Sequence, residues 1–260
     1  MGETLEIDGR RLEVRRFGEL RPDTPALVLL HEGLGCVALW KDFPDRLAAA
    51  TGLPVVAYSR LGYGGSDPAP LPRGVDFMHR EAQDTLPSLL RALRIDRAVL
   101  LGHSDGGSIA LIHAATVRPS PVVGVVAEAP HVFVEEITLR SIRAAAVSYR
   151  DGDLRRRLLP YHGANVDGAF RGWSDVWLDP AFRDWDLRGL LCELTVPVLV
   201  LQGDADPYGT LAQVEAIRDG CAGEVETKIL SGCGHAPHVE RPRAILDAAS
   251  AFVAELLGRS

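Results

Sequence analysis

Residues 98–115 read AVLLGHSDGGSIALIHAA and contain the spacing G-x-S-x-G around Ser104. The apolar run before Gly102 is typical of a buried strand, and the run after Gly106 is typical of a helix. Glycines two residues before and two residues after a serine let strand and helix approach closely at a sharp turn, which exposes the hydroxyl. The stretch therefore predicts a strand–turn–helix unit with Ser104 as a nucleophile. The alternative is a glycine-rich turn with an idle serine.

A serine hydroxyl is a weak nucleophile and needs a base, which in turn needs an orienting carboxylate. Two loops that follow strand-like runs supply both. Asp204 and Asp206 come after PVLVLQ at 197–202, and His235 stands in a glycine-flanked loop after VETKIL at 225–230. Functional loops of open α/β sheets lie at the carboxyl ends of the strands. We therefore expect His235 as the base and Asp206 as the orienting acid, with Asp204 as a close rival.

Short β-type runs alternate with helical runs along the chain, which is typical of an α/β sheet. Most of the runs are apolar throughout, as in parallel strands buried on both faces. The expected strands are Thr4–Asp8, Arg11–Phe17, Ala26–Leu30, Pro54–Ser59, Ala98–Gly102, Val122–Glu128, Pro197–Gln202 and Val225–Leu230. The expected helical segments are Leu47–Ala50, Phe77–Leu93, Gly106–Ala115, Thr210–Arg218 and Ala244–Leu257. The sequence thus predicts a mostly parallel, eight-stranded sheet flanked by helices.

Residues 131–188 break this alternation, because they contain no strand-like run and hold eight of the 16 aromatic residues of the chain. A crossover between parallel strands needs only about a dozen residues. We therefore interpret 131–188 as a helical cap inserted into a core made of 1–130 and 189–260; an ordinary pair of crossover helices is the alternative. Three tryptophans of the segment either line a substrate pocket or attach the cap to the core: Trp173, Trp177 and Trp185.

Composition excludes several classes of protein. A net charge of -7 and a pI near 5.6 exclude electrostatic binding to nucleic acid or to an anionic bilayer. No apolar run approaches the ~18 residues of a membrane span, and residues 1–16 do not resemble a signal peptide. The four cysteines form no C-x-x-C pair. The pattern H-x-x-H at His235 and His238 has no evident third metal ligand in the sequence. We therefore interpret His238 as a surface loop residue. We expect a cytoplasmic protein with a small-molecule partner and no metal; monomer and homodimer remain open.

Five motifs together carry a resemblance to a known family. They are LLHEGLG (29–35), SRLGYGGSD (59–67), GHSDGG (102–107), LVLQGDADP (199–207) and GCGHAPHVERP (232–242). In this order and spacing they resemble the α/β-hydrolase fold over essentially the whole chain. Within that superfamily the chain is similar to small capped bacterial hydrolases near the enol-lactonase, biphenyl-hydrolase-like and C–C hydrolase branches. The resemblance implies a cofactor-free enzyme with Ser104 as nucleophile, Asp206 as orienting acid and His235 as base.

The same resemblance locates an oxyanion hole of two backbone N–H groups. One is that of Asp105, directly after the nucleophile. The other is expected from Gly33, with Leu34 as second choice, in the loop that follows the strand ALVLL. Here Glu32 stands where the family pattern has glycine. A left-handed backbone at Glu32 would cost about 1–2 kcal/mol.

Glu32 and Asp105 place two carboxylates beside a site that must stabilise a negative charge. One hypothesis is that they recognise an amine or another cationic group of the substrate. The favoured interpretation is that each carboxylate turns away and accepts hydrogen bonds from the backbone or an arginine such as Arg60, because unpaired buried carboxylates are expensive.

These features predict a serine hydrolase that cleaves a small-molecule carboxylic ester through an acyl-enzyme. Lactone, thioester and amide bonds remain open as substrates. An alternative with the same residues is hydrolysis of a carbon–carbon bond in a ring-cleavage product. A third reading, of another class, is a non-catalytic small-ligand receptor on the same fold.

Overall fold

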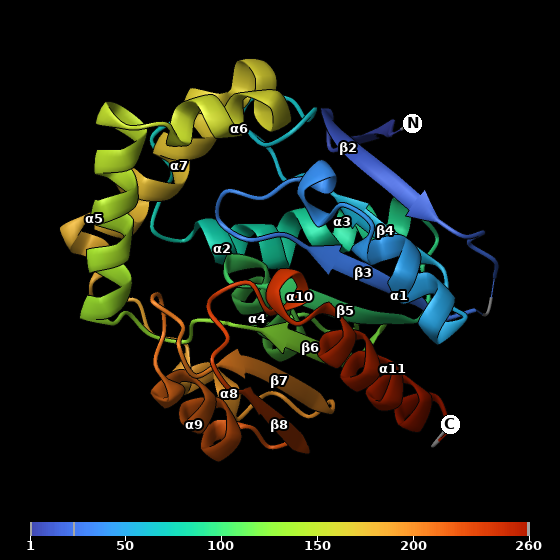
Figure 1. The fold of residues 1–260 in the computed structure, drawn as a ribbon. Coiled ribbons are helices and arrows are strands. Elements are labelled where there is room, and N and C mark those ends of the chain that lie inside the picture. Colours follow the sequence, from blue (N-terminus) through green and yellow to red (C-terminus); the bar gives the residue numbers. More distant parts are fainter. Residues whose placement is uncertain (1, 23, 259–260) are drawn as a thin grey trace.

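The computed structural model describes residues 2–22 and 24–258, and within them the chain forms one sheet of eight strands (Figure 1). Their order across the sheet is β1-β2-β4-β3-β5-β6-β7-β8. The strands are β1 (Glu3–Ile7), β2 (Arg10–Phe17), β3 (Ala26–Leu30), β4 (Val55–Tyr58), β5 (Ala98–His103), β6 (Val122–Glu128), β7 (Val198–Gly203) and β8 (Val225–Leu230). β2 runs antiparallel to β1 and β4, and the other neighbouring strands are parallel. The predicted mostly parallel, eight-stranded sheet is confirmed.

The α-helices of the described residues are α1 (Phe43–Thr51), α2 (Phe77–Arg80), α3 (Leu86–Ala92), α4 (Asp105–Thr116), α5 (Glu136–Asp151), α6 (Leu154–His162), α7 (Val166–Leu178), α8 (Arg188–Leu191), α9 (Leu211–Gly220), α10 (Pro237–Glu240) and α11 (Pro242–Gly258). The helix expected over Phe77–Leu93 contains a π-helical turn at Glu81–Thr85. Pro87 follows this turn, and because proline has no N–H to donate to the preceding turn, a wider turn there is understandable. None of these helices is long and apolar enough to cross a membrane.

Successive residues of the buried strands face two different helical layers. On β3, Leu27 and Leu29 pack with helices α1 and α11, whereas Val28 and Leu30 pack with α3 and α4. All five residues of β3 are buried, as expected for a parallel strand with helices on both of its faces. This double burial explains why the strand-forming segments read as continuous apolar runs. It also keeps the ends of the parallel strands in fixed positions.

The connection from β6 to β7 holds α5, α6 and α7, which lie together at one side of the molecule in Figure 1. This side is next to the edge at which the parallel strands end. The two ends of the connection meet: Phe133 forms an isolated antiparallel bridge with Asp186, and the Leu187 N–H donates to the Val132 carbonyl at 2.6 Å. The segment therefore leaves the sheet and returns to it at nearly the same place, above the carboxyl ends of β5, β7 and β8.

Candidate active site

Ser104 lies at the turn between β5 and α4 with φ 53° and ψ -120°, a backbone conformation that L-residues rarely adopt. Such strain costs about 1–3 kcal/mol and persists only where the surrounding structure enforces it. A methyl group on Gly102 would lie 2.1 Å from the carbonyl oxygen of Gly106, and one on Gly106 would lie 2.0 Å from the carbonyl oxygen of Leu30. Both glycines are therefore required for the close approach of strand and helix. The Ser104 N–H donates to the carbonyl oxygen of Glu128 at 2.8 Å, which fixes the turn against β6.

The imidazole of His235 bridges Ser104 and Asp206. Its Nδ1 lies 2.8 Å from Asp206 Oδ2, and its Nε2 lies 2.9 Å from Ser104 Oγ. Since an ionised carboxylate only accepts, Nδ1 carries the proton and a neutral His235 leaves Nε2 free to accept the serine hydroxyl. The three residues predicted from the sequence as nucleophile, base and acid thus meet within hydrogen-bond distance. Their order and orientation are those of a nucleophile, a general base and an orienting carboxylate.

Asp206 and not Asp204 faces the histidine. Besides His235, Asp206 accepts from Gln202 Nε2 at 2.8 Å and from the backbone N–H of Tyr208 at 2.7 Å. Burial raises the pKa of Asp206, but the hydrogen bond and charge of His235 outweigh it, so the net pKa lies below the usual value. Asp204 instead accepts from the N–H of Gly232 at 2.7 Å, which holds the loop before His235.

The loop after β3 is shaped by a buried arginine. Arg60 donates to the carbonyl oxygens of His31 and Glu32, the latter at 2.9 Å. Glu32 does not lie in the left-handed region, unlike five other non-glycine residues of the described chain, so it avoids the expected strain. A methyl group on Gly33 would lie 2.1 Å from Nε1 of Trp173, so glycine allows the close contact of this loop with α7. These contacts set the direction of the Gly33 and Leu34 peptide groups.

Neither Glu32 nor Asp105 binds Arg60 through its carboxylate, and both line the cavity beside Ser104. Asp105 is 1% exposed; its Oδ1 accepts from Trp177 Nε1 at 3.2 Å, and its Oδ2 has no hydrogen-bond partner among the described residues. Burial raises the pKa of Asp105, against the opposing charge of Arg60. The partners differ from the expected backbone or arginine: Glu32 Oε2 lies 3.5 Å from His103 Nδ1, Asp105 accepts from Trp177, and Arg60 donates to main-chain carbonyls instead.

A cavity of about 400 Å³ opens over Ser104, within the range of small-molecule sites. Trp173 and Trp177 of α7 line it, as expected for two of the three tryptophans. Trp185 is not among its lining residues; it stacks on Phe182 with ring centroids 5.3 Å apart, behind Trp177. Trp185 therefore packs against Phe182 and Trp177 and does not line the pocket.

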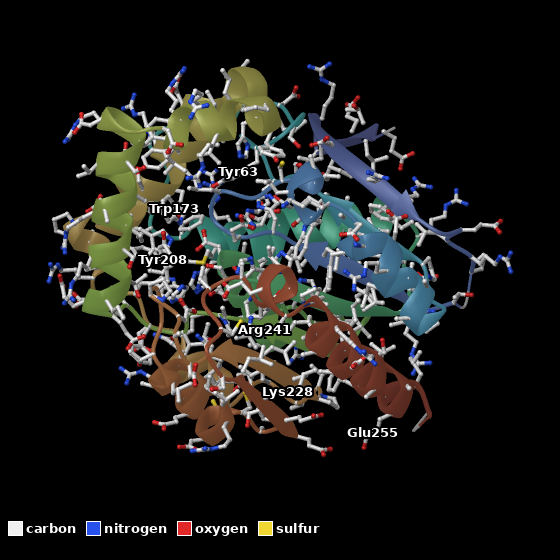
Figure 2. All side chains as sticks on the ribbon, viewed as in Figure 1. Tyr63, Trp173, Tyr208, Lys228, Arg241 and Glu255 are labelled. Carbon is white, nitrogen blue, oxygen red and sulfur yellow. The ribbon has the colours of Figure 1, made fainter. Side chains whose placement is uncertain are left out.

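The cavity also contains residues that the sequence analysis missed, among them Thr138, Arg157, His131 and Tyr208. Figure 2 places Trp173 and Tyr208 between helix α5 and the core, where both face this cavity. The Tyr208 ring lies 4.6 Å from that of His235, and burial lowers the pKa of His131 to about 3. One signal was available: His131 and Tyr208 both stand within a few residues of a strand's carboxyl end. Arg157 lies on an exposed helix face and also reaches the cavity rim.

His238 is also placed differently from the expectation. It is buried, and its ring lies against Glu128 and not at the surface. His235 and His238 therefore face different carboxylates and do not act as a ligand pair. Across residues 2–22 and 24–258, no group of three or more His, Cys, Asp or Glu side chains is arranged to hold a metal ion.

Comparison with known proteins gives consistent matches. The sequence model described as the alpha/beta hydrolase family matches residues 27–248. The chain is 37% identical over 116 residues to the proline iminopeptidase of Levilactobacillus brevis, covering 43% of this chain and 37% of that protein. It is 30% identical over 212 residues to serine hydrolase BPHL of Mus musculus, covering 78% of this chain and 69% of that protein. The chain thus spans well under half the length of the iminopeptidase.

Solved structures agree with this assignment. The crystal structure of VinJ superimposes with a TM-score of 0.74 and 26% identity, covering 98% of this chain and 99% of that chain. The family model covers far more than half of the sequence, including the segments that carry Ser104, Asp206 and His235. The chain belongs to the alpha/beta hydrolase family.

Proposed function

We propose that this protein is a serine hydrolase in which Ser104 attacks the carbonyl carbon of a small-molecule ester. The observation that carries the proposal is the continuous hydrogen-bonded chain from Ser104 Oγ through His235 to Asp206, at 2.9 and 2.8 Å. The strained backbone of Ser104 supports the same role, because strain of this kind gathers at functional sites.

In the proposed reaction, His235 Nε2 takes the hydroxyl proton as Ser104 Oγ forms a bond to the acyl carbon. The resulting oxyanion is stabilised by the N–H groups of Asp105, the first residue of α4, and Gly33, with Leu34 as second choice. Collapse of the intermediate breaks the bond to the leaving group, which receives the proton from His235. Water then attacks the acyl-enzyme, with His235 again as base, and releases the acid and free Ser104.

We propose further that 131–188 is a cap inserted into a hydrolase core formed by 1–130 and 189–260. The meeting of its two ends, through the Leu187 N–H and the Val132 carbonyl, supports this division. So does the position of Trp173 and Trp177 over the cavity. In this role the cap determines which substrates enter the acyl site.

The proposal is tested with a fluorophosphonate probe, which reacts with activated serines. We expect one adduct, on the peptide that contains Ser104, together with turnover of an aryl acetate. A panel of lactones, thioesters, amides and a vinylogous diketone then identifies the bond that is cleaved. Preference for the diketone would support the alternative carbon–carbon hydrolase. Tight binding of a ligand with neither labelling nor turnover would overturn the proposal in favour of a receptor.

The acyl or leaving group is proposed to carry a cation close to the carbonyl. Asp105 Oδ2 is buried, belongs to a cavity-lining residue and has no partner among the described residues, which is costly unless a ligand supplies one. We expect Asp105→Asn to lower kcat/KM for an aminoacyl ester by roughly 30-fold, the equivalent of about 2 kcal/mol for one partner of a buried charge pair.

The matched measurement is the same variant on a neutral acyl ester of similar size. Asparagine keeps an acceptor for Trp177 Nε1, so the pocket retains its shape and the neutral ester loses little. Equal losses on the two esters would contradict recognition of a cation by Asp105.

A further inference from the structure

A second carboxylate–histidine arrangement lies behind the proposed triad. Glu128, the last residue of β6, is completely buried, and its carboxylate is engaged by His238. His238 Nδ1 lies 2.9 Å from Oε2 and 3.1 Å from Oε1, and the backbone N–H of His238 donates to Oε1. Burial raises the pKa of Glu128, but the charges of His238 and His103 outweigh it and lower the net pKa. A buried, ionised carboxylate therefore holds the first turn of α10.

Glu32 and His103 form the second pair. Glu32 Oε2 lies 3.5 Å from His103 Nδ1, the distance of an ion pair and not of a short hydrogen bond. His103 Nε2 lies 2.6 Å from the carbonyl oxygen of His235 and must carry a proton, because a carbonyl oxygen only accepts. Burial opposes protonation of His103, but Glu32 and Glu128 outweigh it and raise its pKa to about 9. At neutral pH His103 is therefore an imidazolium.

The two pairs are joined. The rings of His103 and His238 meet edge to face with centroids 5.0 Å apart, and the ring of His103 lies 5.1 Å from that of His235. His103 directly precedes Ser104 in the chain. The residue that binds the loop of His235, which we call the base loop, is therefore covalently attached to the nucleophile. Glu128 likewise contacts both the turn of the nucleophile and the chain after His235. Its carbonyl oxygen accepts from the Ser104 N–H, and its carboxylate is engaged by His238.

We infer that Glu32, His103, Glu128 and His238, which we name the carboxylate–histidine layer, are positioning residues that fix His235 relative to the nucleophile. The layer fastens the base loop at two points. His103 holds the carbonyl of His235 itself, and the Glu128–His238 pair holds the chain three residues later. This assigns a role to Glu32, which departs from the family pattern, and to His238, which the triad does not use.

The inference rests on the proposed hydrolase and is tested with variants that remove one charge at nearly constant shape. We expect Glu128→Gln to lower kcat for an aryl acetate about 10- to 100-fold with KM little changed, since small misplacements of catalytic groups have effects of this size. Glu13→Gln is the control. Glu13 is a partly buried carboxylate that accepts from Ser59 Oγ at 2.7 Å and from the Gly65 N–H at 2.9 Å, outside the layer. We expect its kcat to be unchanged.

Glu32→Gln supplies a pH readout that a purely structural role would not move. The groups that face His103 are Glu32, Glu128, His131, His235 and His238. The protonated form of His103 is lost near pH 9 in the wild type. Because Glu32 stabilises that form, its removal lowers the pKa of His103. The alkaline limb of the kcat profile then moves to lower pH.

The rate of fluorophosphonate labelling distinguishes the positioning role of the carboxylate–histidine layer from the proposed hydrolase activity itself. We expect slower labelling of Glu128→Gln and Glu32→Gln and none of Ser104→Ala. Wild-type rates and pH profiles in both glutamine variants, with Ser104→Ala unlabelled, would overturn the inference and leave the hydrolase intact. No labelling of the wild type would remove the hydrolase and the inference together. Thermal unfolding checks each variant; Glu32, with its partly exposed side chain, serves as the test if Glu128→Gln does not fold.

Discussion

We expect Ser104→Ala to lower kcat for an aryl acetate by about a million-fold, the loss found when the nucleophile of a serine hydrolase is removed. The substitution deletes the Oγ that lies 2.9 Å from His235 Nε2. No acyl-enzyme can form without it. The residual rate reflects binding and the oxyanion donors alone. Steady-state kinetics with separately purified wild type and variant measure the effect.

Ser174→Ala is the matched control for this experiment. Ser174 is buried on α7 and donates only to the neighbouring Asp175, at 3.0 Å. We expect its kcat to stay close to that of the wild type. If Ser104→Ala retained turnover comparable to Ser174→Ala, another residue would have to be the nucleophile.

Asp206→Asn lowers kcat by about 10⁴-fold, whereas Asp204→Asn has little effect. An amide at 206 no longer requires His235 to carry its proton on Nδ1, so the imidazole is free to present the wrong tautomer to Ser104. Asp204 contacts the Gly232 N–H and leaves the histidine untouched. The two variants carry the same chemical change at positions two residues apart, so each is the control of the other.

Kinetics of both asparagine variants, measured at one pH, separate these roles. A larger loss in Asp204→Asn than in Asp206→Asn would show that the loop after β7 rearranges in solution. Equal losses would point to a general effect on the fold of this loop.

Sequence patterns were sufficient wherever a residue's role depends on its immediate neighbours. The apolar strands, the two glycines around Ser104 and the glycine-flanked His235 each have a local signature, and their strands bring them to one edge. The sequence favours Asp206 over Asp204, but Asp204 stays a close rival because both follow the same strand within two residues of each other. The choice is visible in space, where one carboxylate faces His235 and the other faces Gly232.

Contacts between distant segments could not be predicted in this way. Glu128 and His238 are 110 residues apart, and no local pattern marks their pairing. Trp177 and Trp185 are the same residue type in the same segment of the sequence. Only the direction of each side chain decides which of them reaches the cavity. Likewise, the preference of Arg60 for main-chain carbonyls depends on the path of the loop after β3.

The distance along the chain between Ser104 and His235, 131 residues, has a consequence for biosynthesis. The hydroxyl precedes in the chain the imidazole that we propose as its base, and that imidazole follows β8. Until that last strand has joined the sheet, the nascent chain carries an ordinary, unreactive serine. On the proposed mechanism, a fragment that ends before β8 therefore lacks the base and carries an unactivated Ser104.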